Sequence, residues 1–141
     1  MSWLLDTCVV SELVKPRPKA GVIEWVQQRD EEELFLSVIT IGELEKGIAK
    51  LRDAARRSVL ERWVRVDLVE RFRGRLLPID SAGASRWGAV VGAAEARGEP
   101  LPVIDGLIAA TGLQHDFTVV TRNVADLARF GARCFDPWAG K

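Results

Sequence analysis

The sequence predicts an α/β fold in which a parallel sheet of four to five strands is covered by helices on both faces. Short apolar runs alternate along the chain with longer segments whose apolar residues recur at helical spacing. The first run, residues 3–6, is apolar without alternation, which is typical of a strand buried on both faces. The 141 residues suit one domain, 1–141, with one core.

The N-terminal half predicts two strands and several helices. We expect a strand at 3–6, a helix at 7–14 that ends before two prolines, a helix at 21–29 and a strand at 33–36. Ser37 or Thr40 would cap the following helix, and Glu43 lies three residues after Thr40, as in a capping box. Residues 54–73 read as a long helix with an apolar stripe and an arginine-rich face.

The C-terminal half continues the alternation. A strand is expected at 76–79, followed by a helix at 81–97 whose alanines and glycines permit close packing. Pro102 opens a helix that runs to about residue 115, and a fourth strand follows at 118–121. A short helix at 124–130 and an edge strand at 133–135 complete the fold.

The composition of the chain limits the classes of protein to which it can belong. With 20 basic and 20 acidic residues, the net charge gives no attraction to nucleic acid, so any such attraction must come from a local patch. We expect no membrane span and no signal peptide, because no apolar run approaches 20 residues and the first residues lack a basic segment. Cys8 and Cys134 show no metal spacing, and we expect buried thiols in a cytoplasmic protein.

Four short acidic signatures carry the functional information. Three set one carboxylate in apolar sequence, and the fourth, Thr121-Arg122-Asn123, precedes Asp126. The three isolated carboxylates are Asp6 after the first strand, Glu43, and Asp105. A charge in apolar surroundings is costly unless it is paired or bound to a cation.

These acids predict a pocket for Mg²⁺ or Mn²⁺. Sites on parallel sheets form beyond the carboxyl ends of the strands, where Asp6, Thr121 and Asn123 are expected. Glu43 and Asp105 are expected in the first turns of two helices, which favour ionised carboxylates. A hard divalent ion with oxygen ligands would relieve the repulsion, hold a phosphate oxygen and activate a water molecule.

The chain resembles the PIN-domain ribonucleases of the VapC toxin type, from bacterial toxin–antitoxin pairs. The resemblance is carried by Leu5-Asp6-Thr7 with Ser11-Glu12, Ile41-Gly42-Glu43-Leu44, Asp105-Gly106-Leu107-Ile108-Ala109 and Thr121-Arg122-Asn123. It implies a three-layer α/β/α sandwich, magnesium-dependent RNA cleavage, a homodimer, and inhibition by a small VapB-like antitoxin that itself binds DNA.

By the same resemblance, Asp6 and Asp105 are metal ligands and Glu43 is the third acid. Thr121 would orient a carboxylate or water. Two positions depart from the family pattern: Cys8 stands where asparagine is usual, and Asn123 stands where a fourth acid is usual. Asp126 would compensate from the following turn.

Structural interpretations stay open beside these roles. Asp6 and Asn123 can simply cap helices, Glu43 can belong to a capping box, and Asp105 and Asp126 can be ordinary helix-start or surface acids. His115 is expected to end a helix and not to act in catalysis. Arg122 can grip a phosphate or stay solvated, and the arginine-rich face can be an ion-paired surface.

Competing functions are weaker. A receiver domain needs a lysine after a late strand, and the chain has none between Lys50 and Lys141. A haloacid-dehalogenase-like phosphatase needs Asp-x-Asp, but Cys8 stands at the second position. The main alternative is a degenerate PIN fold that binds only RNA or an antitoxin.

Overall fold

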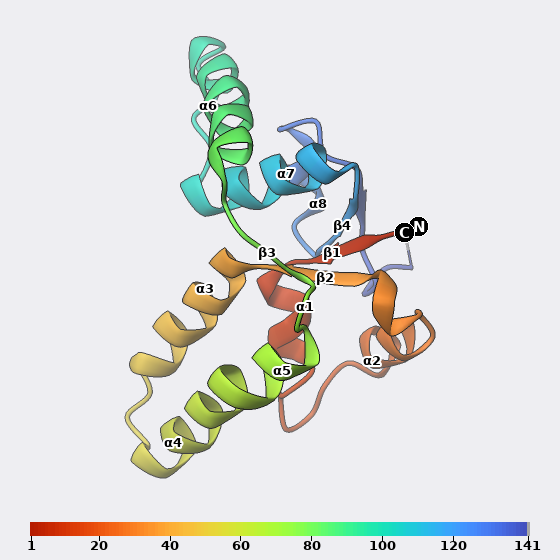
Figure 1. Cartoon of the computed structure of the whole chain (residues 1–141), viewed down its shortest axis with the longest axis vertical. Coiled ribbons are helices and arrows are strands. Elements are labelled where there is room, and N and C mark those ends of the chain that lie inside the picture. The colour runs from red at the N-terminus through yellow and green to blue at the C-terminus, as the bar shows by residue number, and fades with distance from the viewer. Residues whose placement is uncertain (141) are drawn as a thin grey trace.

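A parallel sheet of five strands, in the order β3-β2-β1-β4-β5, forms the centre of the molecule (Figure 1). The computed structural model describes residues 1–140. The strands are β1 (Trp3–Leu5), β2 (Leu34–Ser37), β3 (Leu76–Leu77), β4 (Thr118–Val120) and β5 (Cys134–Phe135). Every neighbouring pair is parallel, as predicted. Strand order reverses between β1 and β4, so a crevice is expected at their carboxyl ends.

Helices cover both faces of the sheet, which makes the predicted three-layer sandwich (Figure 1). One face carries α6 (Ser81–Ala96), α7 (Val103–His115) and α8 (Val124–Ala128). The other carries α1 (Thr7–Glu12), α2 (Ala20–Gln27), α3 (Val38–Ala49), α4 (Ala54–Arg62) and α5 (Val69–Arg71). Leu4 packs into the first layer and Leu5 into the second, because successive strand residues point to opposite faces.

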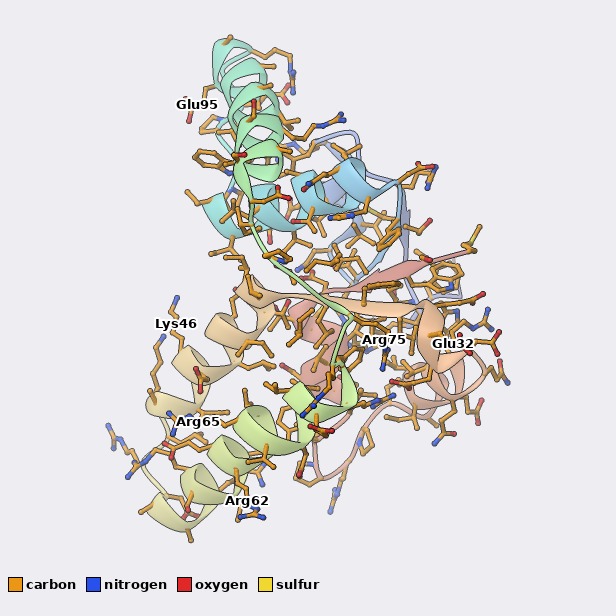
Figure 2. All side chains as sticks on the ribbon, in the orientation of Figure 1. Glu32, Lys46, Arg62, Arg65, Arg75 and Glu95 are labelled. Carbon is orange, nitrogen blue, oxygen red and sulfur yellow. The ribbon has the colours of Figure 1, made fainter. Side chains whose placement is uncertain are left out.

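The predicted helix at 54–73 is one continuous helical segment with a change of winding. A π-helix, Trp63–Leu68, joins α4 to α5 and buries Val64 and Leu68. The arginines of this face form ion pairs, including Arg65–Glu45 at 2.8 Å and Arg71–Glu31 at 2.9 Å. Figure 2 shows Arg62 at the outer edge of α4, away from the sheet. This face therefore matches the interpretation of an ion-paired surface.

The start of α3 differs from the expected capping box. Ser37 is the cap, and its hydroxyl accepts a hydrogen bond from the Ile39 N–H at 3.0 Å. Thr40 is wholly buried inside the helix, and no acidic residue lies in the first turn. The capping-box interpretation and the first-turn placement of Glu43 were therefore wrong, because the helix begins one turn earlier than Thr40 would set it.

Two further expectations concern the cysteines and the membrane. Both Cys8 and Cys134 are free thiols, half-buried where fuller burial was expected. Burial, followed by the charge of Asp6, raises the pKa of the Cys134 thiol to about 11. Within residues 1–140, no helix has both the length and the apolarity to cross a membrane.

Candidate active site

Asp6 lies at the point where β1 ends and α1 begins, with 5% of its surface exposed. Its Oδ1 accepts the Thr7 N–H at 2.8 Å, so it caps α1. Its Oδ2 accepts the Thr121 hydroxyl at 2.8 Å. The Cys8 thiol also donates to Oδ2, so of the two lone-pair positions on each carboxylate oxygen the one on Oδ1 keeps room for another partner. The cap role and a site role therefore coexist in one side chain.

Burial raises the pKa of the Asp6 carboxyl, and it outweighs the hydrogen bonds from Thr121, Thr7 and Cys8 that favour ionisation. The ionised carboxylate is thus held where water solvates it poorly. A cation at the free lone pair would offset that cost.

Thr121 connects the end of β4 to this carboxylate. The side chain is fully buried, and its hydroxyl oxygen also accepts the Asn123 N–H at 2.9 Å. Asn123 occupies the cap position of α8, but its side chain makes no capping bond. Thr121 thus brings the Asn123 backbone to the site, while the Asn123 side-chain amide makes no hydrogen bond within the part of the chain that the structure describes.

Glu43 reaches the same place from the second turn of α3. Its Oε1 accepts the Thr7 hydroxyl at 2.6 Å, and the Thr40 hydroxyl lies 3.2 Å from that of Thr7. Thr7 therefore links the carboxylates of α1 and α3: its N–H binds Asp6 and its hydroxyl binds Glu43. Among the described residues the second oxygen of Glu43 accepts no hydrogen bond, so it can take another partner.

Asp105 lies half-buried in the first turn of α7, as predicted. Burial raises the pKa of its carboxyl, and the negative charges of Asp6, Asp126 and Glu43 raise it further. Asp105 on α7 therefore lies within electrostatic reach of Asp6 at the end of β1, Glu43 on α3 and Asp126 on α8. Asp126 is the most solvated of them, with 51% of its side chain exposed, and it lies 3.9 Å from Arg129.

His115 lies at the other end of α7, about 15 Å from Asp105 at the helical rise per residue. Its ring centroid is 5.5 Å from that of Phe117. As expected, it ends a helix and takes no part in the acidic site.

Three residues at the site were not predicted to act there: Thr7 was named only within its motif, Thr40 only as a possible helix cap, and Cys8 only as a departure from the family pattern. The Leu-Asp-Thr motif contains Thr7, but the sequence gives no sign that its hydroxyl reaches α3. The Cys8 thiol sulfur lies 3.8 Å from Asp6 Oδ2 and 3.7 Å from Thr121 Oγ1. Burial, followed by the charge of Asp6, raises the pKa of this thiol, which therefore stays neutral.

The donor set suits a hard divalent ion, although the carboxylates form no closed cage. Among residues 1–140, no three His, Cys, Asp or Glu side chains form a ready-made metal cluster. The available ligands are carboxylate oxygens, which Mg²⁺ and Mn²⁺ prefer, and Mg²⁺ usually keeps several waters with one or two direct carboxylates. An open group of acids that repel one another fits such an ion.

Comparison with known proteins gives a consistent result. The chain is 35% identical over 135 residues to the toxin FitB of Neisseria gonorrhoeae, covering 96% of this chain and 97% of that protein. It is 33% identical over 135 residues to the VapC ribonuclease Y4jK of Sinorhizobium fredii, covering 96% of each. The solved structure of FitAB bound to a DNA fragment superposes with a TM-score of 0.89 at 34% identity, covering 96% of this chain and 95% of the solved one.

The PIN domain family matches residues 3–132, almost the whole described chain. The match includes every strand except the last and all eight α-helices within residues 1–140, together with the six acidic and polar residues predicted for the site. The chain therefore belongs to the PIN domain family.

Proposed function

We propose that this protein is a divalent-metal-dependent endoribonuclease and the toxin of a toxin–antitoxin pair. The observation that carries the proposal is the link from Asp6 to Glu43 through Thr7, with Asp105 close enough for the charges of both acids to raise the pKa of its carboxyl. The relatives named as a toxin and a ribonuclease, similar over almost their whole length, support the same function.

Asp6, Glu43 and Asp105 would hold Mg²⁺ or Mn²⁺, either directly or through water. When bound, the ion would neutralise charge on the phosphate and lower the pKa of a bound water. Thr121 and the Thr7 N–H hold the Asp6 carboxylate, and the Thr7 hydroxyl holds Glu43, so both carboxylates are oriented before an ion would bind. Asp126, together with the Asn123 amide, would orient water at the α8 side of the pocket.

The proposed partners are an RNA substrate in the cytoplasm, a second copy of the chain, and a small VapB-like antitoxin. A hollow of about 220 Å³ between α1, α3 and α4 has a mainly apolar lining that includes Leu44, Ile48, Leu60 and Trp63. Val59 beside it is 67% exposed. An apolar segment of the antitoxin would cover this surface. The solved FitAB complex on DNA supports an antitoxin that binds DNA.

The proposal is tested by brief expression of the wild-type chain and of Asp105→Asn, with sequencing of RNA ends. The wild type is expected to arrest growth and to produce new RNA ends, and Asp105→Asn is expected to do neither. Glu95→Gln is a matched control, because Glu95 is an exposed acid near the far end of α6 (Figure 2).

Intact RNA in cells expressing wild-type protein would contradict the nuclease. It would favour the alternative of a PIN fold that only binds RNA or an antitoxin, to which the departures Cys8 and Asn123 point.

A further inference from the structure

A second hollow, of about 430 Å³, lies between α6 and the end of α8. Its rim is basic and its floor is apolar. The rim and floor residues are Arg86, Arg97, Arg129, Ala89, Ala93 and Phe130. On α6, positions 86, 89, 93 and 97 recur at spacings of three and four, so one helix face presents both arginines and the small residues between them. We call this hollow the arginine pocket.

The pocket carries more positive than negative charge. Arg97 and Arg129 share a single acid, Glu99, each at 3.8 Å. Arg129 also lies 3.9 Å from Asp126. These pairs are long and half-exposed, so they are largely screened by solvent. Within residues 1–140, no carboxylate approaches the Arg86 guanidinium within 4.0 Å, which leaves it free to bind an anion.

The arginine pocket adjoins the carboxylates of the candidate active site. Asp126 and Arg129 lie one turn apart on the α8 segment, and Asp126 is one of the acids whose charge reaches Asp105. Gly106, the residue after Asp105, packs so closely that an added Cβ would lie 3.3 Å from the Phe130 ring. The ring that lines the arginine pocket thus contacts the backbone that carries Asp105.

We propose that the arginine pocket binds one nucleotide of the RNA strand next to the cleaved bond. The phosphate would lie on the guanidinium groups of Arg86, Arg97 and Arg129, because guanidinium forks match phosphate oxygens. The base or ribose would lie against the exposed Ala89 and Ala93, an apolar contact that selects no sequence, while Phe130, which is only 4% exposed, supports the floor from beneath. The inference rests on the proposed nuclease function, and it adds where the RNA strand lies on the protein beside the cleaved bond.

The volume is consistent with this occupant, because sites for small ligands span about 300–1,000 Å³. The chain has no net charge, so a local basic surface is where attraction to an RNA backbone must arise. The neighbouring carboxylates would repel RNA unless a cation or such a surface offset them.

The test is cleavage of a single-stranded RNA of about 16 nucleotides, long enough to occupy a full single-strand site, by Arg86→Gln and Arg97→Gln. Each substitution is expected to raise KM about three- to tenfold with little change in kcat, because it removes one charged contact made equally before and during the reaction. In a plot of the logarithm of the RNA-binding constant against the logarithm of the salt concentration, each substitution should also reduce the slope by about 0.7. Arg86→Lys should retain the salt slope.

Arg62→Gln is the matched control, since it removes an exposed arginine from the outer edge of α4 (Figure 2). Unchanged KM and salt slope in both pocket variants would overturn the proposal. So would variants that disturb the dimer or antitoxin binding while RNA binding stays unchanged, because the pocket would then be a protein interface.

The experiments distinguish a failure of the arginine-pocket proposal from a failure of the nuclease proposal. If the wild type cleaves no RNA with any divalent ion, the nuclease proposal falls. RNA binding by the same arginine variants, in an Asp105→Asn background, then decides the pocket alone: equal binding by all variants refutes it.

Discussion

Thr121 donates a hydrogen bond of 2.8 Å to Asp6 Oδ2 across 115 positions of sequence, and both side chains are almost wholly buried. The bond joins the carboxyl ends of β1 and β4, the two strands between which the strand order reverses. One hydroxyl thus fixes the orientation of the acid and the position of the loop that carries Asn123.

Replacing Thr121 by valine is expected to destabilise the protein by about 1–3 kcal/mol, because it leaves a buried carboxylate oxygen and the Asn123 N–H without their partner. The free energy of unfolding in urea at neutral pH measures this. Thr121→Ser, which keeps the hydroxyl, should lose much less. A valine variant as stable as the wild type would refute the account of this bond.

Thr7→Val is expected to lower the kcat of RNA cleavage strongly while it has little effect on the free energy of unfolding. The Thr7 hydroxyl holds Glu43 at 2.6 Å, and without it the glutamate loses its defined orientation in the pocket. We expect roughly a ten- to hundredfold loss of RNA cleavage, as for other residues that orient metal ligands. Thr7→Ser should restore most of the rate; a full rate for the valine variant would exclude a positioning role.

Asp105→Asn is expected to stabilise the metal-free protein while abolishing cleavage. It removes a charge that burial and the charges of Asp6, Asp126 and Glu43 all disfavour. The gain should be up to about 1 kcal/mol, or about 4 °C in Tm, because half-exposed charges are partly screened. Thermal unfolding in a chelating buffer measures it. A lower Tm would show that Asp105 supports the fold.

The stability gained through Asp105→Asn is expected to depend on pH. The folded-state pKa of Asp105 is raised above its ordinary value of 3.8, so the folded protein binds this proton more tightly than the unfolded chain. The contribution of Asp105 to the stability of the wild type therefore falls as pH rises from 3.8 through the folded-state pKa. The difference between variant and wild type should vanish toward the acidic end of that range. A difference that grows on acidification would contradict the sign of the shift.

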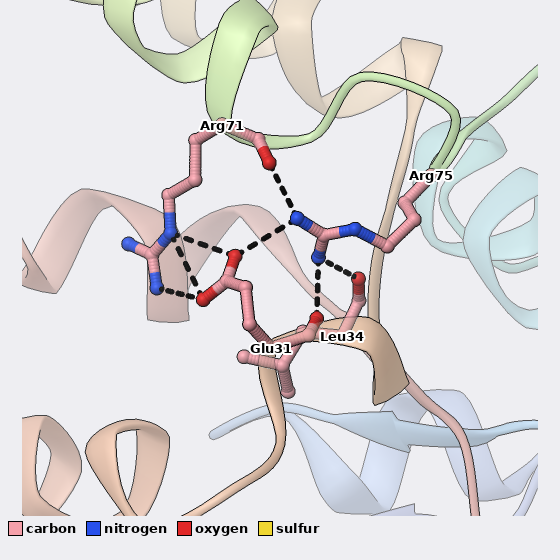
Figure 3. A network of polar contacts seen from close by, with 4 residues as sticks. All are labelled: Glu31, Leu34, Arg71 and Arg75. Carbon is pink, nitrogen blue, oxygen red and sulfur yellow. Dashed lines mark hydrogen bonds and ion pairs between the residues drawn. The ribbon is translucent and has the colours of Figure 1, made fainter.

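Arg75 is expected to be the strongest stabilising cation on the surface. Figure 3 shows its guanidinium bound to the Glu31 carboxylate and to the carbonyls of Glu31, Leu34 and Arg71. Its side chain is only 16% exposed. Arg75→Ala should cost about 2 kcal/mol, since several acceptors lose one donor, while RNA cleavage per folded molecule stays unchanged.

Arg73→Ala serves as the control for Arg75. Within residues 1–140 Arg73 pairs with Glu70 alone, and its side chain is 78% exposed, so its loss should stay within about 0.5 kcal/mol. Equal losses for the two variants, measured by urea unfolding, would remove the distinction between the buried network and an ordinary surface pair.

Much of the fold could be predicted from the sequence because each strand and helix has a recognisable pattern in its own residues. Apolar runs, proline breaks and helical stripes placed all five strands and the helices around them to within a few residues. The π-helical winding of Trp63–Leu68 could not be predicted, since it depends on how Val64 and Leu68 pack against the sheet layer. The cap of α3 was left open between Ser37 and Thr40, because their hydroxyls offer the same chemistry three residues apart, and the structure selects Ser37.

The site was predictable at the level of its carboxylates, which stand out in apolar sequence. Its hydrogen bonds were not, because they join distant segments. The contact from Thr7 to Glu43 depends on how α1 and α3 cross, and the contact from Cys8 to Thr121 depends on how the ends of β1 and β4 meet. The assignment of Asp6, Glu43 and Asp105 as metal ligands stays a prediction.

Calorimetric titration of Mn²⁺ into the purified protein tests the central claim most directly. We expect saturable binding to the wild type, at least tenfold weaker binding to each of Asp6→Asn, Glu43→Gln and Asp105→Asn, and unchanged binding to Glu95→Gln. Equal binding of Mn²⁺ by the wild type and all three pocket variants would contradict a shared metal site.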